Sequence, residues 1–289
     1  RAFLESDGRN LTWIEAGNRI AFCRVDRRRG TCLRQSLDEP ILTASRPTSS
    51  GNLVAWVKLT FRGDNILQLC ERAADTGRCQ TLDVMRAVGD DAPKLQGNRL
   101  VWDAKIGDQA SDVFFCEYDS IRRECPVQRL TAHVARQAGS DLDGHHVVFE
   151  DDRAGPTQVR GLHLPVLKTL RHQKIRAGKR LRVPVRSHTR ELALSAESAG
   201  GASLAELGAR FFDRGQGRGL LVWRPRPDQL GSHAFTFQGT TRSGLVTRQT
   251  IRIEVTRPQP RWKKLRRFWR RIAQRSMGAK SLEMLLEDR

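Results

Sequence analysis

Long apolar runs are missing from this 289-residue chain, and none approaches the ~18–20 residues that a membrane-spanning helix needs. We therefore expect it to be soluble or peripherally attached to a membrane. The sequence also lacks a nucleophile elbow, an H-E-x-x-H pair and a P-loop, which are common signatures of catalysis and nucleotide binding. We expect a protein without catalytic activity and without a cofactor; a Ser/His/Asp site split along the chain stays open as the alternative.

Cysteine occurs only in three regular pairs. Each pair encloses eight residues, and the first members of successive pairs are 47 and 46 residues apart. Because directly opposed residues of an antiparallel hairpin have Cα atoms close enough for a disulfide, we predict three hairpin disulfides around loops at 26–29, 73–76 and 119–122. The sequence has no C-x2-C spacing, which is typical of zinc sites, so we expect no zinc binding by the cysteines. Disulfides at this density indicate an extracytoplasmic protein, which is periplasmic, at the cell surface or secreted. The predicted pairs are Cys23 with Cys32, Cys70 with Cys79, and Cys116 with Cys125.

A second motif recurs with nearly the same period as the cysteine pairs. It is a glycine-led apolar hexamer that ends in Trp or Phe, and its aromatic residues are 43, 46 and 47 residues apart. The four copies are Gly8–Trp13, Gly51–Trp56, Gly97–Trp102 and Gly144–Phe149. A period of ~40–50 residues is typical of β-propeller blades, and we expect a turn at each glycine and an aromatic side chain buried between blades.

This first module, about residues 1–165, resembles the TolB-type propeller repeats of exported bacterial proteins. The resemblance rests on Gly97–Asp103, Arg129–Thr131 and Phe149–Gly155. It implies a propeller, although only about three and a half repeats are present, fewer than the ~4–8 blades that close a ring. Because the chain starts at Arg1 within a repeat, we expect missing N-terminal blades and an export signal outside the sequence. Completion of the ring by another chain is the alternative.

The second module, residues 170–257, has alternating strands punctuated by Gly and Pro and contains no cysteine, as expected of a β-sandwich. It resembles the Ig-like and dystroglycan-type cadherin-like domains of bacterial surface proteins. The match is carried by the strand that Gly178 and Lys179 open, by Trp223-Arg224-Pro225, and by Gly231–Phe237. Calcium-binding relatives have an Asp-rich stretch where this chain has Arg186–Arg190, so we expect no calcium bridge.

Excess positive charge is confined to the second half of the chain. Residues 1–165 carry 23 Lys+Arg against 23 Asp+Glu, residues 166–257 carry 18 against 6, and residues 258–289 carry 10 against 3. Such asymmetry marks modules with separate partners. Within the sandwich the charges are scattered along predicted strands, so they reflect either general Arg richness or contacts with phosphate-like anions.

The tail, residues 258–289, is predicted to contain a short basic amphipathic helix at 261–272. Trp262, Leu265, Trp269 and Ile272 recur at three- and four-residue spacing and form an apolar stripe, while Lys and Arg cover the other face. Such a helix suits an anionic membrane or lipopolysaccharide. Docking of the stripe onto the sandwich or a partner is an equal alternative, and nucleic acid is disfavoured outside the cytoplasm. The candidate contact residues are Arg261, Trp262, Lys263, Lys264, Leu265, Arg266, Arg267, Trp269, Arg270, Arg271 and Ile272.

Two short clusters bear on metal binding. Asp141 and Asp143 lack the spacing and the closing Glu of a calcium loop, so we expect such acidic residues to cap turns and pair with Arg. His145 and His146 begin a predicted strand, where alternation should point their rings to opposite faces. We therefore predict no metal site.

These features predict an all-β protein with a partial, N-terminally truncated propeller, an Ig-like β-sandwich and a basic amphipathic tail. We expect a non-enzymatic exported or cell-surface scaffold whose propeller and sandwich bind a protein or an envelope polysaccharide. The alternative is a fragment of an enzyme that processes envelope polysaccharide or peptide, in which the propeller gates substrate access.

Overall fold

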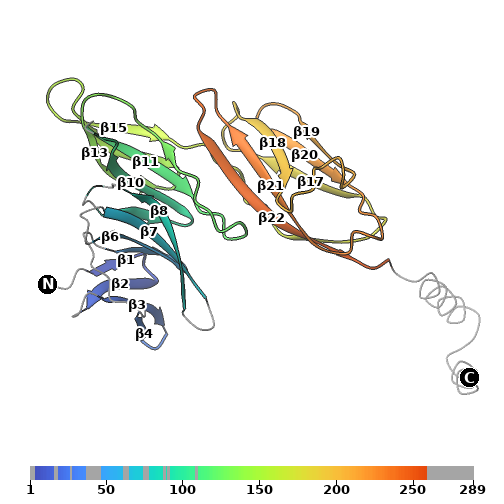
Figure 1. Cartoon of the computed structure of the whole chain (residues 1–289), viewed down its shortest axis with the longest axis horizontal. Helices are drawn as coiled ribbons and strands as arrows, with labels where there is room; N and C mark the ends of the chain where they lie inside the picture. Colours follow the sequence, from blue (N-terminus) through green and yellow to red (C-terminus); the bar gives the residue numbers. More distant parts are fainter. Residues whose placement is uncertain are drawn as a thin grey trace, which may run out of the picture.

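The computed structural model shows a chain built from β-strands. It describes residues 4–15, 19–26, 28–36, 47–60, 65–73, 78–86, 89, 92–107 and 110–258. All regular secondary structure in these segments is β-strand, and the strands form six sheets (Figure 1). The predicted tail helix at 261–272 lies outside the described residues. In the described part of the chain, no helix has the length and apolar character to cross a bilayer.

The first half of the chain forms four antiparallel sheets in which the strands follow one another in sequence order. The first sheet consists of β1 (Leu4–Ser6), β2 (Asn10–Glu15), β3 (Arg19–Asp26) and β4 (Thr31–Ser36). The second consists of β5 (Thr48–Ser50), β6 (Leu53–Leu59), β7 (Asn65–Arg72) and β8 (Cys79–Arg86). The third consists of β9 (Lys94–Gln96), β10 (Arg99–Lys105), β11 (Ser111–Glu117) and β12 (Gln128–Arg129). The fourth has three strands, β13 (Gln137–Asp143), β14 (His146–Asp151) and β15 (Gln158–His163).

The glycine-led hexamer forms the first turn and the second strand of each of these sheets. Gly97 and Gly144 have positive φ angles of 62° and 59° at the first position of a two-residue hairpin turn, a conformation that glycine adopts without strain. The strand after Gly97 is buried almost throughout, because the second and fourth sheets cover both faces of the third. Trp102, which ends its hexamer, is only 2% exposed.

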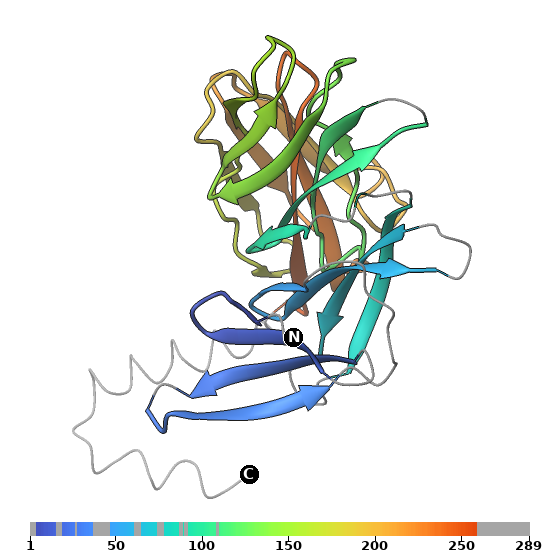
Figure 2. The same cartoon turned by 90° about the vertical axis from the view of Figure 1, so that its left-hand side faces the viewer.

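Apolar side chains join each sheet to the next. Each interface has its own core, with Trp56 and Phe22 between the first and second sheets, Trp102 between the second and third, and Phe149 and Phe115 between the third and fourth. The first and fourth sheets lie at opposite ends of this stack (Figures 1 and 2). The prediction of a propeller is wrong. The fourth sheet stops at three strands and the chain then enters the sandwich, so the described sheets form an open row rather than a ring.

All three predicted disulfides are present, with Cα atoms 5.5, 5.5 and 5.3 Å apart in chain order. The predicted register of the hairpins is wrong, however. Cys23 lies opposite Arg34 and Cys32 lies opposite Val25, so the bridge runs diagonally across the hairpin. The second hairpin has the same two-residue offset. In these two hairpins strand pairing therefore extends past the first cysteine of the pair. In the third, β12 pairs only with Phe114 and Phe115, and an isolated bridge joins Asp119 to Glu124.

The second half of the described chain is a β-sandwich. One sheet has the strand order β16-β22-β21-β18 and the other has the order β17-β20-β19. Four strands facing three is the arrangement of immunoglobulin-like sandwiches. Trp223 is fully buried in the shared core, and its indole N–H donates to the carbonyl oxygen of Leu207 at 2.9 Å. The strands are β16 (Gln173–Arg176), β17 (Leu181–Arg186), β18 (Ala193–Ser198), β19 (Ala209–Asp213), β20 (Arg218–Trp223), β21 (Gly231–Thr240) and β22 (Val246–Thr256).

Hydrogen bonds fasten the sandwich to the third sheet. One carboxylate oxygen of Glu117, at the end of β11, accepts from the hydroxyl of Thr247 at 2.8 Å and from the backbone N–H of Arg248 at 3.0 Å. The side-chain amide of Gln128 both donates to and accepts from the backbone of Val246, each at 2.7 Å. The start of β22 is therefore held by a polar junction against β11 and β12.

Candidate functional site

The outer face of the sheet β17-β20-β19 carries basic side chains at regular intervals. Along β17, Leu181, Val183 and Val185 point into the sandwich core and are at most 8% exposed. Because side chains alternate along a strand, Arg182 and Arg186 point outward, and both are exposed. The local sequence thus buries one face of the strand and leaves cations on the other.

Strand pairing aligns these side chains in rows across the sheet. On the central strand, Val222 lies opposite Arg182 on one side and Arg210 on the other. Since adjacent strands are about 4.8 Å apart, the two arginine backbones are about 10 Å apart across this row. In the next row, Leu220 lies opposite Phe212. Paired cations therefore border an apolar row on the same face.

A groove of about 1180 Å³ follows these rows. Its apolar part includes Phe212 and Leu220, and its single carboxylate is that of Asp213. That carboxylate already accepts from the backbone N–H groups of Leu194 and Gly215, both at 2.9 Å. We call this groove and its cations the basic groove. Its cations are Lys179, Arg180, Arg182, Arg210, Arg214 and Arg224.

The charges of the basic groove are not compensated locally. Within the described segments, none of its six cations forms an ion pair with a carboxylate. Like charges on one face repel one another, and a bound anion relieves that repulsion while accepting charge-assisted hydrogen bonds. The ring of Phe212 is 47% exposed and gives the groove an apolar platform. This combination suits an extended polyanion that also has apolar faces.

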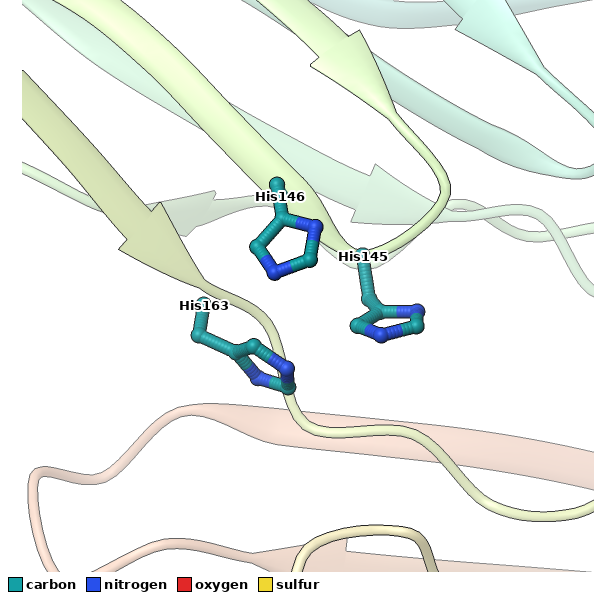
Figure 3. A group of neighbouring side chains, drawn as sticks. All are labelled: His145, His146 and His163. Atoms are coloured by element: carbon teal, nitrogen blue, oxygen red, sulfur yellow. The ribbon is translucent and has the colours of Figure 1, made fainter.

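A second cluster lies where the fourth sheet meets the connection to the sandwich. The rings of His145, His146 and His163 face one another (Figure 3), and one nitrogen of each lies within 4.8 Å of the other two. The ring centroids are 4.7–4.9 Å apart. The prediction that His145 and His146 point to opposite faces is wrong. The strand begins at His146, so His145 belongs to the preceding turn and does not follow the alternation of the strand.

The register of β14 and β15 places the third imidazole. His146 and His163 lie directly opposite each other, and cross-strand pairs share one face of a sheet. The carbonyl oxygen of His145 accepts from the backbone N–H of Leu164 at 2.7 Å, which holds the turn against the end of β15. Partial burial lowers the pKa of His145, and the neighbouring His163, His146 and Arg99 lower it further.

The structure describes the predicted disulfide cysteines but not the predicted contact residues of the tail. The six cysteines form their three disulfides, whereas the candidate contact residues of the tail, 261–272, lie outside the described residues. Sequence reasoning missed the basic groove and the histidine cluster. The alternation of Leu181–Arg186 signals outward arginines, but it does not show which strands flank β20.

No protein-family model and no curated protein matches the sequence. Among solved structures, the titin M3 domain aligns with a TM-score of 0.27 at 20% identity, over 32% of this chain and 97% of that chain. Domains 4 and 5 of the S-layer protein SbsC give 0.24 at 12% identity, over 54% and 90%. An endo-fucoidan hydrolase of glycoside hydrolase family 107 gives 0.27 at 13% identity, over 74% and 39%. Scores this low carry no argument about function.

These findings correct the two family resemblances. The TolB-type and cadherin-like assignments are wrong, because no family model matches either half and the described sheets do not close into a propeller. The described structure is all-β, with three disulfides and a sandwich of two sheets. Its three disulfides indicate an oxidising, extracytoplasmic compartment.

Proposed function

We propose that this chain is a non-enzymatic extracytoplasmic binding protein with an Ig-like sandwich whose basic groove holds an anionic polysaccharide of the cell envelope. The observation that carries the proposal is the row in which Arg182 and Arg210 flank Val222, next to the apolar row of Leu220 and Phe212. The disulfides support a location where such polymers occur.

The chemistry of the groove favours a carboxylate-bearing sugar polymer. Guanidinium groups bind carboxylates with two parallel hydrogen bonds, and regularly spaced arginines suit a chain with repeating charges. The exposed ring of Phe212 gives an apolar platform for the face of a sugar ring. Arg182 and Arg210 stand on strands of a β-sheet, so their backbone needs little ordering when the polymer binds.

The rest of the described chain acts as a scaffold in this proposal. The junction between Glu117 and β22 ties the sandwich to the stacked sheets, and the disulfides brace the hairpins of three of those sheets. The groove faces away from the core, on the sheet that does not contain β22. The polymer therefore has access to the groove while the junction stays intact.

The test is equilibrium binding of the full chain to polygalacturonate by isothermal titration calorimetry at about 0.1 M ionic strength, where the Debye length is about 10 Å, with neutral dextran as the comparison. Arg182→Ala/Arg210→Ala removes two charges, each contributing about 1 kcal/mol at contact in water, so we expect about 30-fold weaker binding. The matched control, Arg242→Ala/Arg252→Ala, removes two exposed charges from β22 and its hairpin loop. We expect it to change the affinity less than about threefold, because charges beyond a Debye length are screened.

Other outcomes would contradict the proposal. Equal losses in the two double variants would mean that net charge, not the groove, binds the polymer. Tighter binding to phosphatidylglycerol vesicles or to single-stranded DNA than to polygalacturonate, weakened by Arg182→Ala/Arg210→Ala, would assign the groove to another ligand class. Release of reducing ends from the polymer by the wild-type chain would favour the alternative that it belongs to a polysaccharide-processing enzyme.

A further inference from the structure

The three facing histidines form a site that the polysaccharide proposal does not use. We propose that His145, His146 and His163 bind a divalent transition-metal ion of the Zn²⁺ or Cu²⁺ type. Three imidazoles, one from each of the paired strands β14 and β15 and one from the turn between β13 and β14, face one another (Figure 3). Imidazole nitrogen is a preferred ligand of Zn²⁺ and Cu²⁺.

The geometry is close to that of a bound state. With Zn–N bonds of about 2.05 Å, the ligand nitrogens of a tetrahedral site are about 3.3 Å apart. In the structure they lie within 4.8 Å of one another, so each pair of nitrogens must approach by at most about 1.5 Å. His146 and His163 are exposed and His145 is half-buried, so their rings can rotate without disturbing the core. The backbone positions are already set by strand pairing and by the bond from Leu164 to His145.

The surroundings select the type of ion. The three side chains offer only nitrogen ligands, whereas Ca²⁺ and Mg²⁺ require oxygen ligands. The nearby cation Arg99 is itself engaged: its Nη1 donates to the carbonyl oxygen of Gly144 at 2.8 Å, and its Nε donates to Glu117 at 2.9 Å.

Such a site has a structural consequence. Gly144 and His145 form the turn before β14, and His163 is the last residue of β15, directly before the connection to the sandwich. An ion bound to all three histidines would tie this turn to the end of the strand that leads into the sandwich. Three protein ligands leave a fourth position for water or for a donor from another molecule.

The test is titration of the full chain, without a polyhistidine tag, with ZnCl₂ and CuCl₂ alone, followed by calorimetry. We expect one strong equivalent of Zn²⁺ or Cu²⁺ and no heat of site binding with CaCl₂. His145→Ala, His146→Ala and His163→Ala should each weaken binding at least tenfold, since even outer-shell changes commonly cost about 10–100-fold. The matched control His133→Ala removes an exposed imidazole outside the cluster and should leave the affinity unchanged.

A second readout separates ligand loss from misfolding. Electron paramagnetic resonance of the Cu²⁺ complex should show coupling to several nitrogens in the wild-type chain and fewer in each single variant, and the metal-free variants should keep the wild-type urea midpoint. The proposal is overturned if the wild-type chain binds these ions no more tightly than the triple His→Ala variant. It is also overturned if His133→Ala reduces the affinity as much as the cluster variants do.

Discussion

Replacing Glu117 with Ala should weaken the junction between the third sheet and the sandwich. The carboxylate is 9% exposed and connects three groups. One oxygen accepts from Nε of Arg99 at 2.9 Å, and the other accepts from the hydroxyl of Thr247 at 2.8 Å and the backbone N–H of Arg248 at 3.0 Å. Removing it leaves a largely buried guanidinium without its counter-ion and two further donors without their acceptor.

The magnitude follows from the burial of these partners. Truncating one member of a buried, hydrogen-bonded ion pair costs about 3–5 kcal/mol, because the remaining charge stays desolvated. The Arg99–Glu117 ion pair lies within the third sheet. The part of the loss that weakens the coupling to the sandwich comes from the two donors in β22, Thr247 and Arg248. Glu117→Gln keeps an oxygen acceptor and should lose less, about 1–3 kcal/mol.

The assay is equilibrium unfolding in urea followed by tryptophan fluorescence. Trp223 lies in the sandwich core and Trp56 and Trp102 lie in the stacked sheets, so the summed emission of the six tryptophans follows unfolding of both halves. The control is Glu254→Ala, also on β22, where the carboxylate is 54% exposed and pairs with Lys174 at 3.1 Å; an exposed pair of this kind contributes at most about 1 kcal/mol. A loss below about 1 kcal/mol for Glu117→Ala, or equal losses for the two variants, would refute the account of the junction.

Three further predictions concern the disulfides, acid stability and the tail. Cys116→Ser/Cys125→Ser should lower the free energy of unfolding by about 2–3 kcal/mol, as expected for a short loop, and a urea midpoint equal to that of the oxidised wild type would contradict this. Burial alone would raise the pKa of Asp151, but Arg153 and Arg160 outweigh it and lower the pKa. The stabilisation of the fold by the ionised Asp151 is therefore present above about pH 4, and it is lost as the pH falls through the lowered pKa. Urea midpoints measured from acid to neutral pH should show Asp151→Asn destabilised at neutral pH and equal to wild type at the acid end; a constant difference would count against this. Deleting the tail, residues 258–289, should abolish co-sedimentation with phosphatidylglycerol vesicles, whereas equal binding of both forms, or none by either, would rule out membrane contact by the tail.

Local features of the sequence predicted local structure well. The glycine-led hexamers predicted the turns and buried aromatic residues at Trp56 and Trp102, and the cysteine spacing predicted all three disulfides. Both depend on residues close together in the chain. The alternation in Leu181–Arg186 likewise corresponds to a strand with one buried face.

These local features did not predict how the sheets pack on one another or which distant strands pair. Whether repeated sheets close into a ring or stack in a row depends on how their faces pack, and a repeat of similar length fits both. The juxtaposition of Arg182 and Arg210 depends on both β17 and β19 pairing with β20, and that of His146 and His163 depends on the register of β14 with β15. Only the pairing of distant segments reveals the two candidate sites.

Arginine footprinting tests the central claim, that the basic groove binds an anionic polysaccharide, most directly. The full chain is modified with phenylglyoxal in the presence and absence of polygalacturonate, and the extent of modification at each arginine is measured by mass spectrometry. The account predicts protection of Arg182, Arg210 and Arg224 by the polymer, with Arg242 and Arg252 modified equally in both conditions. Protection confined to arginines outside the groove, with Arg182 and Arg210 unprotected, would contradict it.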